Sequence, residues 1–401
     1  MRVARILTLI TSVFTGVILL AYDYPMKPFN KQHKVIATLG ESRGVRFHNG
    51  VDIKPYTTTS TDSFWLVYSL LSDTMIRITY VPPEDTFNNG VRDKSGSYSY
   101  IHLTNRIQDN TFANAFVDTI GRIYASKAHC HFIEKDSTGR WINPLRPGGL
   151  NPFIDTVPPI IESVSFKRQG SGTHLDKNNL NDSVDIVVRV YDPRVDTTGA
   201  GAGRGMGIYR IQYEICDTLK NPIPGAINSY QFDSIPLNDA YARYGLVYYD
   251  STDWNSGIFY YWVTNAPFSN IPNQYWNTKQ HINRQWNEPP AESIEVAKFK
   301  DGFYYVKIKA WDICRPDTNP PDSEFVKVRI ANFRPRVKST IPTNGQGNVP
   351  VDQHIYITFS EAMDRTEDIS ISGNQEEGYQ VIGLSEVEIY LTFYIINQEE
   401  V

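Results

Sequence analysis

The sequence predicts an all-β protein in which an N-terminal antiparallel sheet domain is followed by β-sandwich domains. From residue 22 to about residue 152, short runs of β-favouring residues alternate with Gly, Pro, Asn and Asp. Several later runs alternate apolar with polar side chains, as strands with one solvent-exposed face do. No stretch has the spacing of a long amphipathic helix.

The first 21 residues have the pattern of a secretory signal peptide. A basic start at Arg2 and Arg5 precedes an apolar stretch from Ile6 to Leu20, and the small residue Ala21 follows. The alternative is a retained membrane anchor, but about 15 residues are fewer than the roughly 20 that a spanning helix needs. We therefore expect residues 1–21 to be removed and the remainder to be secreted, periplasmic or at the cell surface, with no membrane contact.

The length of the chain limits the number of domains, and its charge limits the possible partners. A chain of 401 residues is long enough for two or three domains. The formal net charge is -5, and basic and acidic residues are spread evenly. The sequence lacks the basic face that phosphate binding needs, so we expect no nucleic acid partner. No pattern in the sequence indicates an oligomeric state.

The three cysteines limit disulfide bonding, since an odd number in an exported chain leaves at least one unpaired. Cys216 and Cys314 both follow strand-like runs and could pair, although sequence alone does not test their separation. Cys130 lies between two histidines, and we expect it to be the unpaired residue.

The middle region, residues 153–333, is predicted to be a β-sandwich. It begins near the proline-rich segment 151–159, where the backbone is restricted, and we place the end of the preceding domain at residue 152. The predicted strands are residues 184–191, 208–215, 258–263, 303–311 and 325–330. The long Asn- and Pro-rich stretch from about Asn265 to Ala291 is predicted to be an inserted surface loop.

A third domain is predicted from residue 334 to residue 401. It opens with a proline-flanked strand and an Asn-Gly turn at Asn344, and continues to a Phe-Ser-Glu-Ala-Met-Asp segment that ends at Asp364. This pattern resembles the opening of the bacterial Ig-like domains found in many surface proteins. Because such a sandwich needs about 100 residues, we expect the sequence to end inside the domain.

Three short clusters in the first third of the chain contain residues suited to a hydrolytic metal centre. The chain has only eight histidines, so this grouping is informative. The five residues are His48, Asp52, His102, His129 and His131. Zinc in a hydrolytic site takes three protein ligands, histidine nitrogen or carboxylate oxygen at about 2.0–2.2 Å, and leaves one position open for water.

Strand geometry predicts how these residues can converge. The His and Asp of the first cluster are four apart and share a face, with Gly50 as a flexible point between them. His129 and His131 are two apart, so on a strand both imidazoles face one cleft. Cys130 then points to the opposite side, which argues against a Cys ligand in this cluster.

In their order and residue pattern, the clusters resemble the zinc peptidases of the lysostaphin and LytM type, the M23 family of peptidoglycan endopeptidases. The matching segments are Gly-x-Arg-Phe-His48-x-Gly-x-Asp52-Ile, Tyr-x-His102-Leu, and His129-x-His131-Phe followed by Asn143-Pro-Leu145. The resemblance covers roughly residues 25–150. It implies an M23-like zinc peptidase domain at residues 22–152, followed by Ig-like β-sandwich domains.

By this resemblance His48, Asp52 and His131 bind a Zn2+ ion. His102 and His129 form the catalytic pair beside the open position. Two histidines and one carboxylate leave positive charge on a metal, which activates bound water and polarises a scissile carbonyl. One histidine of the pair can take the proton of the water, while the other hydrogen-bonds the oxyanion and helps to protonate the leaving amine. Which histidine does which is left open.

The predicted function is that of an exported zinc metallo-endopeptidase. The resemblance implies peptidoglycan stem peptides or cross-bridges as the substrate, and another peptide substrate is left open. The alternative is a non-catalytic cell-surface protein that binds peptidoglycan or mediates adhesion, with a degenerate peptidase domain and Ig-like spacers. None of the five residues is replaced, which favours the enzyme.

The sequence also departs from the family. Between the first two clusters the usual Gly-rich run is replaced by a Thr- and Ser-rich segment 57–62, an apolar segment 64–68 and a polar loop 82–90. The residues that line the substrate groove are therefore not predictable. Four other histidines are expected to be structural or on the surface, namely His33, His174, His281 and His354.

Overall fold

The computed structural model describes most of the chain. The described residues are 21–81, 86–193, 205–236, 240–278, 299, 301–313, 320–332, 337–343, 345–350, 353–359, 380–383 and 388–392. Residues 1–20 of the predicted signal peptide, Cys314 and His281 lie outside this part. The chain divides into one compact unit, Met1–Gln280 with Gly302–Ile330, and a second unit, His281–Asp301 with Ala331–Val401.

The all-β prediction is confirmed. The named strands of the described part all pair antiparallel, and α1 (Ala240–Val247) is its single α-helix. Two 3₁₀ turns, η1 (Ser63–Trp65) and η2 (Thr86–Asn88), complete the helical structure of these residues. Within the described ranges, no helix is long and apolar enough to cross a membrane.

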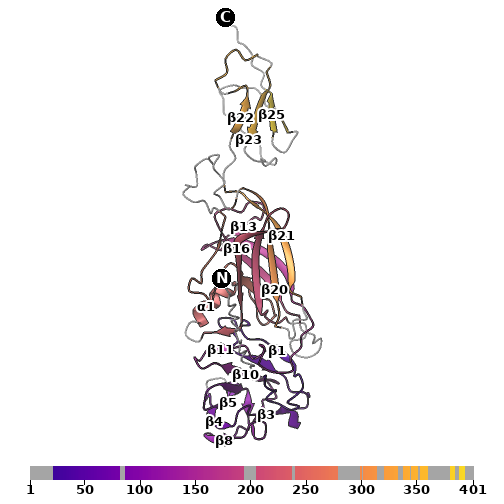
Figure 1. Ribbon diagram of the computed structural model, residues 1–401, viewed down its shortest axis with the longest axis vertical. Coiled ribbons are helices and arrows are strands. Elements are labelled where there is room, and N and C mark those ends of the chain that lie inside the picture. Colours follow the sequence, from indigo (N-terminus) through magenta and orange to yellow (C-terminus); the bar gives the residue numbers. More distant parts are fainter. Residues whose placement is uncertain are drawn as a thin grey trace, which may run out of the picture. The chain divides into compact units, whose positions relative to one another are not determined.

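A large antiparallel sheet forms the N-terminal region (Figure 1). Its main path is β1 (Val35–Ala37), β2 (Val51–Ile53), β10 (Cys130–Lys135), β6 (Tyr98–Ile101), β5 (Gly90–Asp93), β4 (Asp73–Ile78) and β8 (Thr111–Ala113). Beside it, a smaller sheet contains β3 (Leu66–Tyr68), β9 (Thr119–Ile123) and β7 (Leu103–Thr104).

The large sheet also includes a strand from the middle region. β11 (Trp141–Ile142) pairs with β10 on one side and with β17 (Ser234–Ile235) on the other. The boundary that we predict at residue 152 therefore separates two regions that share one sheet.

The two faces of the large sheet have different roles. Phe132 on β10 lies opposite Val51 on β2 and Tyr100 on β6, and all three side chains are fully buried. Side chains alternate along a strand, so the neighbouring residues Asp52 and His131 point to the other face. The apolar face thus forms the core, and the polar face holds the candidate ligands.

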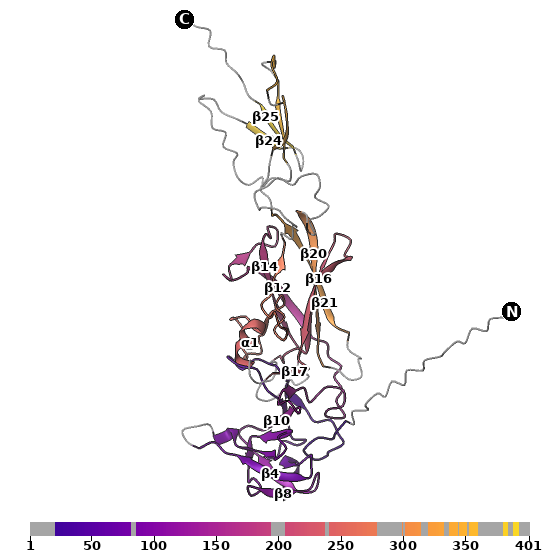
Figure 2. The same cartoon turned by 60° about the vertical axis from the view of Figure 1, so that its left-hand side comes forward.

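The middle region contains two sheets, which the turned view separates (Figure 2). One consists of β13 (His174–Leu175), β12 (Ile160–Arg168), β14 (Ser183–Tyr191), β18 (Tyr260–Trp262) and β19 (Trp276–Asn277). The other consists of β16 (Pro222–Gln231), β15 (Arg210–Cys216), β20 (Gly302–Trp311) and β21 (Asp322–Ile330). All five strands predicted for this region are present, with ends shifted by a few residues.

The prediction of one long surface loop from Asn265 to Ala291 is wrong in part. Trp276 and Asn277 form β19, which pairs with Ser183 and Val184 of β14. The Trp276 side chain is buried there, so the apolar surface of one indole outweighs the loop-forming neighbours in sequence. Residues 279–291 lie outside the described part.

The second compact unit contains a four-stranded antiparallel sheet. Its order is β22 (Val337–Ile341), β23 (Ile355–Phe359), β25 (Glu388–Thr392) and β24 (Gln380–Gly383). The strands β22 and β23 correspond to the proline-flanked opening and the Ile-Tyr-Ile-Thr-Phe run of the predicted third domain.

Candidate metal centre

The three predicted zinc ligands are brought together by the pairing of β2 with β10. His131 on β10 is the direct cross-strand partner of Asp52 on β2. His48 lies in the loop that leads into β2. Gly50 permits a close approach there, because a Cβ atom at this position would lie 2.2 Å from the carbonyl oxygen of Phe132. Our prediction of Gly50 as a flexible point missed this role.

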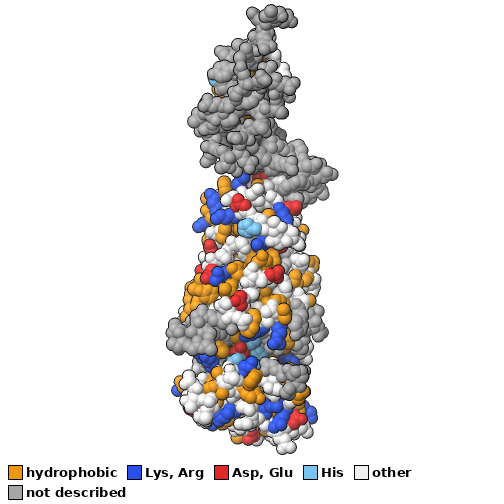
Figure 3. All heavy atoms as spheres, turned by 180° about the vertical axis from the view of Figure 1, so that it is seen from behind, with side chains coloured by type: hydrophobic (Ala, Val, Ile, Leu, Met, Phe, Trp, Pro, Cys, Tyr) orange, Lys and Arg blue, Asp and Glu red, His pale blue; other side chains and the backbone are white. Residues whose placement is uncertain are grey.

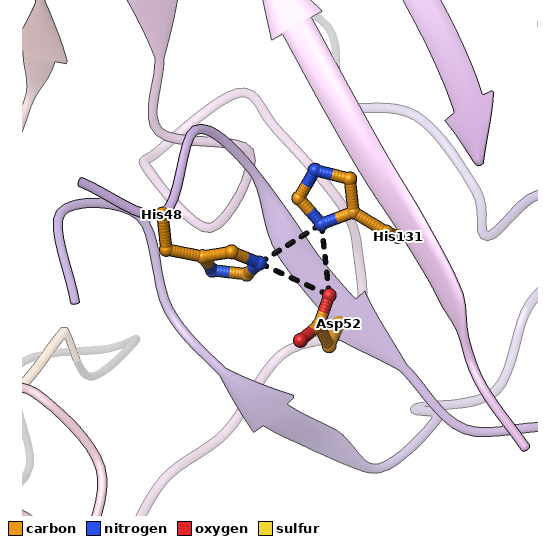
Figure 4. Close-up of side chains that lie close together, drawn as sticks. All are labelled: His48, Asp52 and His131. Carbon is orange, nitrogen blue, oxygen red and sulfur yellow. Dashed lines mark hydrogen bonds and ion pairs between the residues drawn. The ribbon is translucent and has the colours of Figure 1, made fainter. Parts of the chain in front are cut away.

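The side-chain nitrogen and oxygen atoms of His48, Asp52 and His131 face one another (Figure 4). The Nε2 atom of His48 lies 3.1 Å from Oδ1 of Asp52 and 2.8 Å from Nδ1 of His131. The same Nδ1 atom lies 2.8 Å from Oδ1 of Asp52. The three residues thus form a compact group of two nitrogens and one oxygen.

The outer nitrogen of each histidine has its own oxygen acceptor. Nδ1 of His48 lies 2.8 Å from the carbonyl oxygen of Thr38, and Nε2 of His131 lies 2.9 Å from Oδ1 of Asn49. We assign the imidazole proton to these outer nitrogens, because a carbonyl oxygen can only accept. The inner nitrogens are then lone-pair donors aimed at a shared point, as in metal-bound histidines.

Asp52 is held as a carboxylate in spite of its burial. Burial alone would raise its pKa, but positive charge on His48 and His129 and hydrogen bonds from His131 and His48 outweigh that effect when these rings hold protons, and they keep the pKa well below its usual range. Its second oxygen, Oδ2, accepts a hydrogen bond of 3.3 Å from Arg43. Arg43 also donates to Glu41 at 2.6 Å, so the acid is anchored on the side away from the histidines.

The donor set fits a divalent metal ion, zinc in particular. Two unprotonated imidazole nitrogens and a carboxylate oxygen would repel one another without a cation between them. Ligands about 2.0–2.1 Å from a tetrahedral ion are about 3.3 Å apart, and the distances of 2.8 to 3.1 Å found among His48, Asp52 and His131 need only a small expansion. Three protein ligands leave the fourth position for water.

The predicted catalytic pair lies beside this group. Nε2 of His129 is 3.6 Å from Oδ1 of Asp52. The rings of His102 and His129 meet edge to face with centroids 4.8 Å apart, and the centroid of His102 is 6.0 Å from that of His131. All five residues singled out in the sequence therefore belong to one site.

Backbone carbonyls orient both members of the pair. Nδ1 of His102 lies 2.6 Å from the carbonyl oxygen of Phe87, and Nδ1 of His129 lies 2.7 Å from that of Lys127. By the same assignment, Nδ1 carries the proton and Nε2 is the basic nitrogen in each ring. His102 also has a φ of 67°, a left-handed conformation that is costly for a residue with a side chain and occurs often at functional sites.

Burial keeps both histidines of the pair neutral. The pKa of His102 is lowered to about 3, first by burial and then by His129 and His131. Burial also lowers the pKa of His129, although Asp52 opposes this shift. A neutral imidazole keeps an unprotonated Nε2 lone pair, which is the form in which a histidine can accept a proton.

The cysteines and the other histidines lie outside the group of five site residues. Cys130 is fully buried in the core on the opposite face from His131, which confirms the direction predicted for its side chain. His33 is buried between the carbonyls of Lys54 and Pro28. His174 and His354 are exposed. Cys216 is a buried free cysteine, which contradicts the pairing with Cys314 that the sequence left open.

A groove of about 870 Å³ lies over the site. His102, His129 and the three candidate ligands line it, together with Trp254 and Asn255 from the middle region. In the space-filling view, histidine side chains reach the surface beside lysine and arginine side chains (Figure 3). The site is therefore open to a substrate and has one wall from outside the N-terminal region.

The middle region also supports the loop that precedes His48. The hydroxyl of Tyr248 donates to the carbonyl of Gly40 at 2.7 Å, and the backbone amide of Gly207 donates to Glu41 at 3.2 Å. Phe47 packs against an aromatic group from the same region, consisting of Phe232, Tyr244, Tyr248 and Phe268. These contacts hold the loop that precedes His48, the first candidate ligand along the chain, in place.

Sequence reasoning missed several residues that orient or enclose the site. Asn49 stands between His48 and Gly50, so its position next to a ligand was a usable signal. Thr38 acts through its backbone carbonyl, which no side-chain pattern can reveal. Trp254 is more than 120 residues from every candidate ligand along the chain, and only the packing of the two regions brings it to the groove.

Comparison with known families identifies one part of the chain. Residues 331–393 match the family model of the bacterial Ig-like domain, so the resemblance stated for the C-terminal region is confirmed. A comparison with curated proteins found no match. No peptidase family was matched for the N-terminal region.

Proposed function

We propose that the N-terminal region is a zinc-dependent endopeptidase. The observation that carries this proposal is the convergence of one oxygen and two nitrogens, from His48, Asp52 and His131, whose geometry leaves room for a cation and a water. A zinc ion bound there would supply an activated water and a polarised carbonyl. A purely structural site would not need two further neutral histidines at its open side.

Each residue of the site has a distinct task in this proposal. Asp52 and the two ligand histidines hold the cation, and Asn49 and Thr38 orient the histidines. His102 and His129 both offer a free Nε2, so one can accept the proton of an attacking water and pass it to the leaving amine. The other would stabilise the oxyanion by donating from Nε2, which requires a second ring proton taken up from solvent when the substrate binds.

The resemblance to M23 enzymes supports peptidoglycan peptides as the substrate class. The leader pattern supports export, with the protein acting in the periplasm, outside the cell or at its surface. The Ig-like domain at residues 331–393 fits a surface protein that presents a catalytic region. The rival proposal, a wall-binding or adhesion protein without turnover, shares these features and differs only in the chemistry of the site.

The test combines metal content with hydrolysis of cell walls. We expect the full chain to contain about one zinc per molecule and to clear a suspension of purified peptidoglycan. His48→Ala and His131→Ala should both lose zinc and activity. His174→Ala is the matched control, because it removes an exposed histidine far from the groove, and it should keep both.

Two results would contradict the proposal in different ways. Clearing of cell walls that survives both ligand variants and a chelator would exclude a metal-dependent reaction at this site. Wall binding by a chain that holds no zinc and cleaves no wall peptide would favour the adhesion protein.

A further inference from the structure

The charge of the groove is opposite to that of the chain as a whole. The chain has a formal net charge of -5, whereas Asp52 is the only carboxylate among the described residues that line the groove. The lining cations are Arg43, Arg46, Arg92, Lys127 and Lys135. A bound zinc ion would add two further positive charges. Such a concave positive site concentrates anionic ligands.

Two of these cations lie at fixed positions on the floor of the groove. His131, Ile133 and Lys135 are successive residues on the same face of β10, because side chains alternate along a strand. Ile133 pairs with Ser99 on β6, and Ser99 pairs with Arg92 on β5. Arg92 therefore lies in the next row of side chains after the ligand His131.

The rise per residue of a β-strand gives the distances of Arg92 and Lys135 from His131 along β10. At about 3.3 Å per residue, the row of Arg92 lies about 7 Å along β10 from the row of His131, and Lys135 lies about 13 Å from it. An extended peptide has the same rise per residue. A side chain two residues from the scissile bond would therefore reach the row of Arg92.

The surroundings of Arg92 suit carboxylate binding better than those of Arg43. Arg43 is already engaged by Glu41 and Asp52. Among the described residues, the Arg92 side chain makes one hydrogen bond, of 3.1 Å from Nη1 to the backbone carbonyl of Asp93. Its guanidinium thus has donors left for the two oxygens of a carboxylate.

We propose that the groove selects acidic peptides, and that Arg92 binds a substrate carboxylate about two residues from the cleaved bond, on the side that lies along β10 towards Lys135. This inference rests on the proposed peptidase function. It adds a position-dependent preference, which metal chemistry alone would not produce.

The experiment uses a series of peptides with a single Glu moved one position at a time, and a second series with Gln at the same positions. Both series start from one labelled peptide of a peptidoglycan stem or cross-bridge. We expect kcat/KM for the Glu peptide to exceed that of the Gln peptide about fivefold when the residue is two positions away on one side. The ratio should fall as salt is added.

Variants assign the preference to Arg92. In Arg92→Gln, the Glu-to-Gln ratio should fall towards one. Lys94→Gln is the matched control, because Lys94 is an exposed cation two residues away that does not line the groove. This control should keep the ratio of the unchanged chain.

The outcomes separate this inference from the proposed function. Equal cleavage of Glu and Gln peptides at every position would overturn the inference and leave the peptidase function standing. If no peptide is cleaved by the zinc-loaded chain, the peptidase function fails, and fluorescence anisotropy of the same labelled peptides decides the inference. Tighter binding of the Glu peptide that is lost in Arg92→Gln would support it, and equal binding would overturn it.

Discussion

Two buried aspartates, one in the N-terminal region and one in the middle region, have opposite shifts in pKa. Asp52 is buried among three histidines and its pKa is held well below the usual range. Asp185 on β14 is 8% exposed, and burial raises its pKa to about 6, with one hydrogen bond from Thr264 as partial compensation. Similar burial therefore gives opposite results, and the neighbours decide the sign.

A third buried acid shows how the N-terminal region satisfies a carboxylate without a metal. Glu134 on β10 accepts two hydrogen bonds from Arg146, of 2.6 and 2.8 Å, and one from the hydroxyl of Tyr22. Asp52 and Glu134 thus lie among histidines or beside an arginine. The middle region leaves Asp185 with a hydroxyl only, which marks it as a cost to stability.

The largest effect is expected from removing the charge of Asp52. Asp52→Asn keeps the shape of the side chain and removes the anionic ligand, so zinc affinity should fall by more than about a hundredfold. Competition with a chromogenic chelator measures this. Asp250→Asn, which changes an exposed aspartate, should leave the affinity unchanged. An unaltered affinity in Asp52→Asn would remove the carboxylate from the ligand set.

Breaking the pair around Glu134 should cost stability without affecting the metal. Arg146→Ala leaves a buried carboxylate with one hydroxyl partner, and we expect the free energy of unfolding to fall by about 3 kcal/mol. Arg140→Ala is the control, because its ion pair with Asp136 is exposed and is worth less than about 1 kcal/mol. Urea denaturation compares the two. Equal losses would show that burial of the pair is unimportant.

Asn49→Ala tests whether the outer hydrogen bond of His131 tunes the metal site. We expect zinc affinity to fall about tenfold or somewhat more, since the imidazole loses the acceptor that fixes its orientation. Asn255→Ala, another groove-lining asparagine, should bind zinc as the unchanged chain does. If both variants bind zinc equally well, the assignment of the His131 tautomer is wrong.

Asp185→Asn should produce a smaller gain that depends on pH. The folded chain binds the proton of Asp185 more tightly than the unfolded chain, because the pKa rises from 3.8 to about 6. The cost of burial is therefore absent near pH 3.5, grows between about pH 4 and 6, and is complete above that range. We expect Asp185→Asn to raise stability by about 1 to 2 kcal/mol at pH 7.5.

Thermal unfolding at several pH values measures this gain. Asp250→Asn should show no such gain at any pH. A stabilisation by Asp185→Asn that persists at pH 3.5 would mean that packing, and not the charge of Asp185, causes it.

Strand periodicity carried most of what the sequence could predict. The alternation in β10 was enough to place His129 and His131 towards one cleft and Cys130 in the core. The pairing of β2 with β10 was not readable, because register depends on contacts between distant segments. Local composition was misleading at Trp276. This residue and Asn277 form a strand, although the surrounding sequence has the composition of a loop.

The pairing of β11 with β17 has a practical consequence for dissecting the protein. A fragment cut at residue 152 would keep β11 but lose the partner that covers its outer edge. It would also bare Phe47, which the aromatic rings of the middle region now enclose. Open strand edges and bared aromatic surface both promote aggregation. Expression of the first 152 residues alone is therefore expected to give poorly folded protein, and a truncation should extend through residue 330.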